Sequence, residues 1–261
     1  MERKRIDVFA DSFPFEIRRF VERADIYDSS CSPEARVFFV DKECGYYIKT
    51  NEKGALKNEA VLTDWFASKG MAPNVVLYTS ADRDWLVTEK ANGEDCTYKK
   101  YIEDPEKLCD VFAETLFWLH QKDVVGCPVQ NRCDSYLRTV DENYANGVFD
   151  KCFLPAKFSH FDSKKAYEFV NERKGLLKND TLIHGDYCLP NVLLDGFKFS
   201  SFIDLGNGGV GDRHIDLFWG AWTLNFNLHT DKYRQRFFDC YGSTLVDKEM
   251  IDLIGVAECF G

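Results

Sequence analysis

The sequence predicts an α+β protein with two lobes, a small antiparallel-sheet lobe over residues 1–91 and a larger helical lobe over residues 92–261. Two observations lead to this fold class. In the first third of the chain, short runs rich in aromatic and β-branched residues alternate with turn residues. After residue 92, apolar residues recur at helical spacing instead. The 261 residues, 45% of them hydrophobic, are enough to bury a substantial core.

The elements of the first lobe follow from these runs. We predict four strands of one antiparallel sheet, over residues 35–41, 44–50, 74–80 and 84–90. Between the second and third strands, residues 55–70 carry apolar side chains on one helical face, namely Leu56, Ala60, Trp65 and Phe66. Gly70 is suited to end this predicted helix, because glycine adopts the left-handed backbone of a helix C-terminus.

The second lobe opens on a helix signal at residues 104–123. Asp104 stands at the N-cap position and Pro105 at the first helical position. The apolar residues of this segment fall on one helical stripe, Leu108, Val111, Phe112, Leu116 and Leu119. Residues 217–229, the longest uncharged stretch, are too short to cross a membrane, and we predict a core helix there.

Composition narrows the classes of function. The first 20 residues are interrupted by charges and lack the apolar segment of a secretory signal. The 10 cysteines include no Cys-x-x-Cys pair, so we expect reduced thiols and a cytoplasmic protein. The net charge of −10 argues against nucleic-acid binding and favours a cationic ligand, although an acidic surface that keeps the protein soluble is the simpler and more common explanation.

Polar residues interrupt an apolar run in "LIHGDYCLPNVLL", residues 182–194. Asp186 and Asn191 form the pattern Asp-x-x-x-x-Asn, and Asp204 follows thirteen residues later in "FIDLG". Phosphoryl transfer needs oxygen ligands for Mg²⁺ and a carboxylate near the acceptor hydroxyl. Asn191 and Asp204 are suited to bind Mg²⁺, and Asp186 is suited to be the carboxylate near the acceptor hydroxyl.

Phosphoryl transfer also needs positive charge around the phosphates. Lys49 ends the strand-like run "YYIKT", and Glu59 follows ten residues later in the predicted helix. This order matches the strand lysine and helix glutamate that form an ion pair in protein kinases.

Together, the segments "LIHGDYCLPNVLL", "FIDLG" and "DRHIDL" resemble the aminoglycoside phosphotransferase family, closest to its 3′-hydroxyl kinases. The resemblance runs from about Ser32 to the end of the chain. It implies a bilobal protein-kinase-like fold and transfer of the γ-phosphate of ATP or GTP, with Mg²⁺, to a hydroxyl of an aminoglycoside. It therefore implies that the protein gives antibiotic resistance. The implied partner is a cationic small molecule, and binding to nucleic acid or to a membrane is not expected.

The resemblance also assigns roles to individual residues. It makes Asp186 the catalytic base, and it makes Asn191 and Asp204 the magnesium ligands. On the nucleotide side it implies that Lys49 and Ser32 contact the phosphates, with Glu59 as the ion-pair partner of Lys49. It also implies that Tyr47 stacks on adenine and that the backbone from Glu89 to Ala91 forms hydrogen bonds with adenine. On the acceptor side it implies substrate binding by Glu258 and Asp150.

Two segments depart from the family pattern on the acceptor side. The loop "GVFDKCFLPAKFSHF" contains Asp150 as its one acid, together with Lys151 and Lys157, where the family carries several carboxylates. Asn207 stands where the family tends to have an arginine. We therefore expect a narrower range of aminoglycosides, and another small hydroxyl metabolite is the alternative acceptor.

Two other readings compete with a kinase. A metallohydrolase would gather His184, Asp186, Asp204 and His214 around a transition metal. That reading leaves Lys49 and the β-rich first third unexplained. A catalytically silent nucleotide-binding module would keep the fold, but the acidic residues of the constellation are intact. Within the resemblance, His184 braces the loop and Asp216 anchors it by hydrogen bonds.

Overall fold

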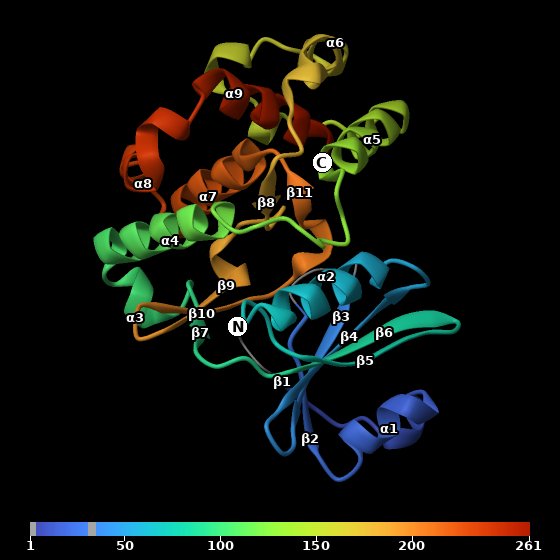
Figure 1. The fold of residues 1–261 in the computed structure, drawn as a ribbon. Helices are drawn as coiled ribbons and strands as arrows, with labels where there is room; N and C mark the ends of the chain where they lie inside the picture. Colours follow the sequence, from blue (N-terminus) through green and yellow to red (C-terminus); the bar gives the residue numbers. More distant parts are fainter. Residues whose placement is uncertain (1–3, 31–34) are drawn as a thin grey trace. The chain divides into compact units, whose positions relative to one another are not determined.

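The computed structural model describes residues 4–30 and 35–261. The chain separates into two compact units, Met1–Tyr98 with Pro190–Gly206 and Lys99–Leu189 with Asn207–Gly261. The first unit holds the large sheet and the second unit most of the helices (Figure 1). These units differ from the continuous lobes 1–91 and 92–261 that the composition predicts. The reason is strand pairing, because β9 (Val192–Asp195) pairs with β7 (Glu94–Asp95) and joins the first unit.

The first unit is built on a six-stranded antiparallel sheet with the order β1-β2-β3-β4-β6-β5. Its strands are β1 (Lys4–Ile6), β2 (Asp25–Asp28), β3 (Arg36–Asp41), β4 (Tyr46–Glu52), β5 (Val75–Ser80) and β6 (Arg83–Glu89). The four predicted strands are confirmed as β3 to β6. The sequence reasoning missed β1 and β2, which are only 3 and 4 residues long.

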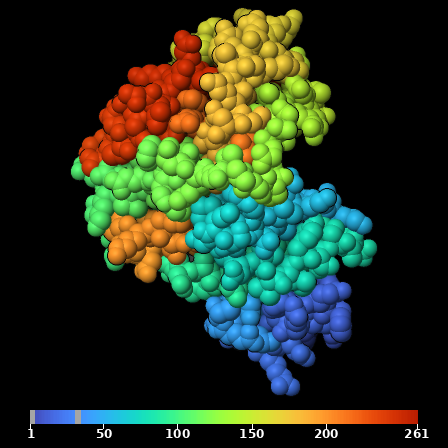
Figure 2. All heavy atoms as spheres, in the orientation of Figure 1, coloured from blue at the N-terminus to red at the C-terminus, as the bar shows by residue number. Residues whose placement is uncertain are grey.

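Helices cover both faces of this sheet. On one face, α1 (Phe15–Val21) packs through Ile17 and Phe20 against a cluster that includes Ile48 of β4. On the other face, α2 (Lys57–Ser68) packs through Ala60 against Leu86 of β6. Figure 2 shows α2, in cyan, at the surface of the first unit. Because side chains alternate along a strand, the neighbours of Ile48 on β4 point to the α2 face.

A smaller sheet completes the first unit. It has the order β10-β9-β7, with β10 spanning Lys198–Phe202. The backbone of Phe202 donates to the carbonyl of Met71 (2.8 Å), and the backbone of Ile203 donates to the carbonyl of Asn191 (3.0 Å). These bonds fix the end of β10, from which the chain runs directly into Asp204.

The second unit consists mainly of helices. They are α3 (Lys99–Ile102), α4 (Pro105–His120), α5 (Arg132–Ala145), α6 (Ser163–Arg173), α7 (Arg213–Leu228), α8 (Tyr233–Gly242) and α9 (Lys248–Ala257). A two-stranded sheet pairs β8 (Thr181–Ile183) with β11 (Gly209–Gly211). Short 3₁₀ turns of the chain are η1 (Ala10–Ser12), η2 (Lys151–Phe153), η3 (Ala156–Phe158), η4 (Lys174–Leu176), η5 (Leu189–Asn191), η6 (Leu205–Asn207), η7 (Ser243–Leu245) and η8 (Glu258–Phe260).

The helices predicted for the second unit are present. The predicted stripe of α4 is buried at Leu108, Phe112, Leu116 and Leu119, and the core helix predicted at residues 217–229 is α7. Asp104 occupies the N-cap position of α4, but its side chain makes no capping hydrogen bond. Within residues 4–30 and 35–261, no helix is both long and apolar enough to cross a membrane.

Candidate active site

A cavity of about 450 Å³ opens on the α2 face of the sheet in the first unit. Its walls come from that unit alone. They include Val37 of β3, Tyr47 and Lys49 of β4, Leu86 and Thr88 of β6, the segment Glu89, Lys90 and Ala91 that follows β6, and Asn191, Ile203 and Asp204 from the β9 and β10 region. The register of the sheet explains this wall, because Tyr47 pairs with Thr88 and Lys49 with Leu86 on the same face.

Lys49 forms a charged centre in this cavity. Its Nζ lies 2.8 Å from Oε2 of Glu59 and 2.7 Å from Oδ1 of Asp204. Burial alone would lower the pKa of Lys49, but the charges of Glu59 and Asp204 outweigh it and raise that pKa. The ammonium group is therefore held in its charged form, as a phosphate-binding lysine requires.

The position of Glu59 depends on a residue that the sequence reasoning missed. Asp84 of β6 is fully buried, and its Oδ2 accepts hydrogen bonds from the backbone of Leu56 (2.9 Å) and from the hydroxyl of Tyr78 (3.0 Å). Leu56 is the N-cap residue of α2 and has no side-chain cap of its own. Asp84 thus supplies the acceptor that the start of the helix needs and fixes the turn that carries Glu59.

Asp204 and Asn191 suit a magnesium ion. Carboxylate and amide oxygens are hard ligands, and Mg²⁺ is commonly held by one or two protein groups together with water and phosphate oxygens. In residues 4–30 and 35–261, no group of three or more His, Cys, Asp or Glu residues is placed to hold a metal ion alone. Asp204 has a left-handed backbone (φ 59°) that Asp tolerates better than most residues, and this conformation ends the strand at the cavity wall.

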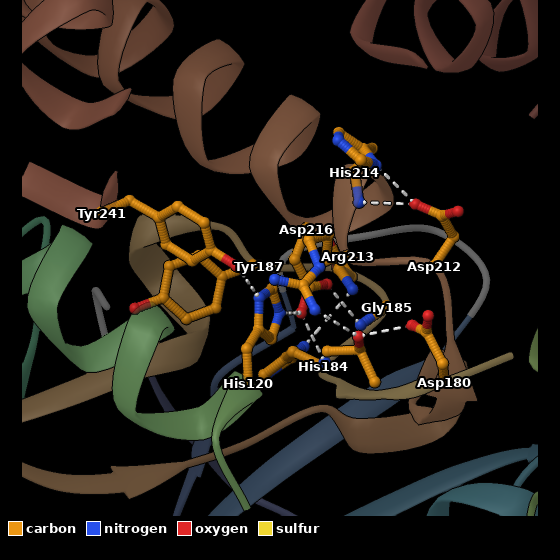
Figure 3. A network of polar contacts seen from close by, with 12 residues as sticks. His120, Asp180, His184, Gly185, Tyr187, Asp212, Arg213, His214, Asp216 and Tyr241 are labelled. Carbon is orange, nitrogen blue, oxygen red and sulfur yellow. Dashed lines mark hydrogen bonds and ion pairs between the residues drawn. The ribbon is translucent and has the colours of Figure 1, made fainter. Parts of the chain in front are cut away.

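The segment that carries Asp186 is clamped by hydrogen bonds in the second unit. Asp216, at 0% exposure, accepts from the backbone amides of His184 and Gly185 (2.7 Å each). The ring Nε2 of His120 also lies 3.1 Å from Asp216 Oδ2 (Figure 3). At the far end of the segment, the amide of Leu189 donates to the hydroxyl of Thr223 (3.2 Å). Asp216 therefore has the anchoring role that the resemblance implies.

Gly185 is required by a close backbone contact. Its φ is +83°, and a Cβ atom added here would lie 1.7 Å from the carbonyl oxygen of Asn207. That same oxygen accepts a 2.6 Å hydrogen bond from Nε of Arg132, whose NH2 group also reaches Oδ1 of Asn207 (3.1 Å). Arg132 of α5 thus holds both the backbone and the side chain of Asn207.

The metallohydrolase reading does not fit these contacts. Nδ1 of His214 lies 2.7 Å from Oδ1 of Asp212, and Nε2 accepts from the backbone of Asp247 (3.1 Å). Both ring nitrogens of His214 are therefore engaged in the packing of the second unit, and neither is available as a metal ligand.

Glu258 is a buried carboxylate of the second unit, with 5% exposure. Its Oε1 accepts from the hydroxyl of Tyr136 (2.9 Å) and from the indole of Trp219 (3.2 Å). Burial raises the pKa of Glu258 to about 7, although both donors act in the opposite direction. Oε2 makes no hydrogen bond to the residues that the structure describes, so this oxygen can accept from a ligand.

The remaining predicted residues have different surroundings. Asp150 caps the turn η2 by accepting from the backbone of Cys152 (2.9 Å), which lowers the pKa of Asp150. Ser32 lies outside the described residues. The sequence reasoning missed Asp84, Arg132, Tyr136 and Trp219, which act through partners distant in sequence and so leave no local pattern.

Three features define the class of this protein. They are the pair of Lys49 and Glu59, the position of Asp204 directly after β10, and the clamped segment that carries Asp186. Together they are typical of a phosphotransferase with a protein-kinase-like fold. The chain belongs to the phosphotransferase enzyme family, whose model matches residues 33–250.

Similar proteins of known sequence include aminoglycoside 3′-phosphotransferases. The chain is 43% identical over 259 residues to a probable aminoglycoside 3′-phosphotransferase of Lactococcus lactis, covering 99% of this chain and 98% of the relative. It is 28% identical to an aminoglycoside 3′-phosphotransferase of Niallia circulans, covering 75% of each chain.

Solved structures confirm the predicted fold class. An aminoglycoside-3′-phosphotransferase of type VIII superposes with a TM-score of 0.75 at 21% identity, covering 99% of this chain and 94% of that one. Aminoglycoside phosphotransferase APH(3″)-Id of Streptomyces rimosus, in complex with ADP and streptomycin, superposes with a TM-score of 0.71 at 20% identity, covering 86% of this chain and 90% of that one.

Proposed function

We propose that this protein transfers the γ-phosphoryl group of ATP to a hydroxyl of an aminoglycoside, most specifically the 3′-hydroxyl, and thereby gives resistance to the antibiotic. The observation that carries the proposal is the contact of Lys49 with both Glu59 and Asp204 in a cavity of nucleotide size. The names of the relatives, and the ADP complex of one similar structure, support the same reaction.

The nucleotide roles follow from the walls of the cavity. Lys49 binds the phosphates, and the ring of Tyr47 stacks on adenine. The backbone from Glu89 to Ala91 pairs with the edge of the base, because this segment lines the same cavity. Asn191 and Asp204 hold Mg²⁺, which when bound neutralises the charge of the phosphates.

Asp186 is the base of the proposed reaction. Its carboxylate accepts the proton of the acceptor hydroxyl while the oxygen of that hydroxyl forms a bond to the γ-phosphorus, and the bond between that phosphorus and the bridging oxygen of ADP breaks. The hydrogen bonds of Asp216 to His184 and Gly185 hold the segment in place, so the carboxylate needs little rearrangement before reaction.

Matched acceptors test the proposal directly. We expect ADP release with kanamycin B and none with tobramycin, which lacks the 3′-hydroxyl but is otherwise the same molecule. Phosphorus NMR of the product would locate the new phosphate ester. Turnover of a neutral polyol together with inactivity towards every aminoglycoside would instead support a metabolite kinase of the same fold.

The metal site gives a separate prediction. Asp204→Ala should weaken the binding of a Mg²⁺ complex of a non-hydrolysable ATP analogue at least about tenfold, because it removes a metal ligand. Without Mg²⁺ the same change should have a smaller effect. Calorimetry with and without Mg²⁺ measures both affinities, and Asp195→Ala, an exposed acid at the end of β9, is the control. Equal affinities of variant and wild type in Mg²⁺ would place the metal elsewhere.

A further inference from the structure

A run of aromatic rings follows one side of α7 in the second unit. The rings of Trp219 and Trp222 lie 5.3 Å apart in a T-shaped contact, and those of Trp222 and Phe226 are stacked at 4.9 Å with an angle of 11°. Phe153 of η2 borders the run, 5.6 Å from Trp219 and 5.9 Å from Trp222. We call Trp219, Trp222 and Phe226 the aromatic stripe.

Core packing explains only one end of this stripe. Trp219 is partly buried and its indole is engaged with Glu258, whereas Phe226 is 62% exposed. A stacked pair of rings that reaches the surface presents a flat apolar face to solvent. Such faces suit stacking against the C–H face of a sugar ring.

The stripe lies beside the anchors of the Asp186 segment. Asp216 and Thr223, which hold this segment at His184, Gly185 and Leu189, are seven residues apart on one side of α7. With 3.6 residues per turn, positions 219, 222 and 226 occupy the adjoining side of the same helix. One helix therefore positions both the proposed base and the aromatic stripe.

Glu258 adds a negative group at the buried end of the stripe. Its Oε1 is taken by Tyr136 and Trp219, and its Oε2 has no hydrogen-bond partner among the residues that the structure describes. A carboxylate with one free oxygen next to aromatic faces is complementary to a protonated amino sugar. The loop at residues 147–161, by contrast, offers a single acid, Asp150.

We propose that the aromatic stripe is the part of the acceptor site that holds a ring of an aminoglycoside by stacking, next to Glu258, to which the family resemblance already assigns substrate binding. The proposal rests on the proposed function, because it assumes that Asp186 acts on an aminoglycoside hydroxyl. It adds how the acceptor is recognised. An aromatic surface stacks on a ring of the aminoglycoside and one carboxylate assists it, in place of a pocket of paired acids.

Substitutions that keep apolar bulk but remove the ring test the stripe. We expect Phe226→Leu and Trp222→Leu each to raise the dissociation constant of kanamycin B by about three- to tenfold, since a leucine has no π-face. The KM for ATP should stay unchanged, because the stripe does not line the cavity around Lys49. Phe15→Leu replaces another exposed ring, 82% exposed on α1, and is the matched control for general surface effects.

Spermine separates stacking from charge. This polyamine carries several ammonium groups but no ring, so the two leucine variants should bind it as the wild type does. Calorimetry with kanamycin B and with spermine gives all the constants, and thermal melting shows whether each variant is folded. Turnover of kanamycin B by the wild type tests the proposed function separately.

Two outcomes would overturn the role of the stripe. One is that the wild type phosphorylates kanamycin B while both leucine variants bind it as tightly as the wild type, which would leave the proposed function intact. The other is equal weakening of kanamycin B and spermine, which would mean that the substitutions act on charge or folding and not on ring stacking. A wild type that neither binds nor phosphorylates any aminoglycoside would remove both proposals.

Discussion

Asp186→Asn is expected to lower kcat by roughly 10²- to 10⁴-fold, the range that general-base catalysis contributes. Asparagine has nearly the same shape and keeps an oxygen that can accept a hydrogen bond from the acceptor hydroxyl. Its amide cannot take up the proton, so the step loses its base. Single-turnover kinetics with saturating ATP and acceptor measures the effect without interference from product release.

The same variant should bind the Mg²⁺–nucleotide complex like the wild type. Asp186 belongs to the second unit and does not line the cavity around Lys49. Asp180→Asn is a suitable control, because Asp180 precedes the same loop and its amide counterpart can still accept from Thr181. Full turnover by Asp186→Asn would exclude Asp186 as the base, and a large loss of nucleotide affinity would assign it to the metal site.

Local patterns predicted much of the first unit. The strands β3 to β6 contain short runs of aromatic and β-branched residues bounded by turn residues, a pattern that can be recognised in a single sequence. Lys49 and Glu59 were paired because their order along the chain matches the strand lysine and helix glutamate of protein kinases, and the two side chains lie 2.8 Å apart. The N-terminal part was missed because β1, β2 and α1 are short and become stable only by packing on the sheet.

Contacts between distant segments could not be predicted in this way. Asp84 accepts from Leu56, the N-cap residue of α2, across 28 positions of sequence, and Arg132 reaches Asn207 across 75. A single sequence carries no record of such pairs, because an aspartate in a strand and an arginine at a helix start look like ordinary surface residues. Glu258 was predicted as a substrate residue only by resemblance, and its burial beside Tyr136 and Trp219 is information that the fold adds.

Glu258→Gln is expected to stabilise the protein at pH 8 by about 3 kcal/mol and to leave its stability at pH 4 nearly unchanged. The pKa of Glu258 is raised from 4.5 to about 7 in the folded protein, because burial disfavours the charged form. Below the unfolded value the group is neutral in both states. As the pH rises from about 4.5 to about 7 the unfolded chain ionises first, so the stability supplied by the neutral group is lost over this range.

Glutamine removes that pH dependence without disturbing the hydrogen bonds. Its amide oxygen can still accept from Tyr136 and Trp219, and it carries no charge at any pH. Chemical denaturation of both proteins between pH 4 and pH 8 measures the difference in the free energy of unfolding. Glu142→Gln, at an exposed position of α5, should give parallel curves for variant and wild type. Parallel curves for Glu258→Gln as well would show that Glu258 does not titrate in this range.

The stabilised variant should bind a cationic acceptor about ten- to a hundredfold more weakly, since it lacks a charge-assisted hydrogen bond. An ammonium group beside Oε2 favours the ionised carboxylate, so binding to the wild type below pH 7 should release a proton from Glu258. Calorimetry in buffers of different ionisation enthalpy detects that proton, and Glu258→Gln should abolish its release. A carboxylate that destabilises the folded protein at pH 8 and yet contributes to acceptor affinity is best explained by selection for binding. If Glu258→Gln gains stability and keeps full affinity for kanamycin B, the buried carboxylate serves no acceptor contact, and the ammonium group must be bound by another acid of the second unit.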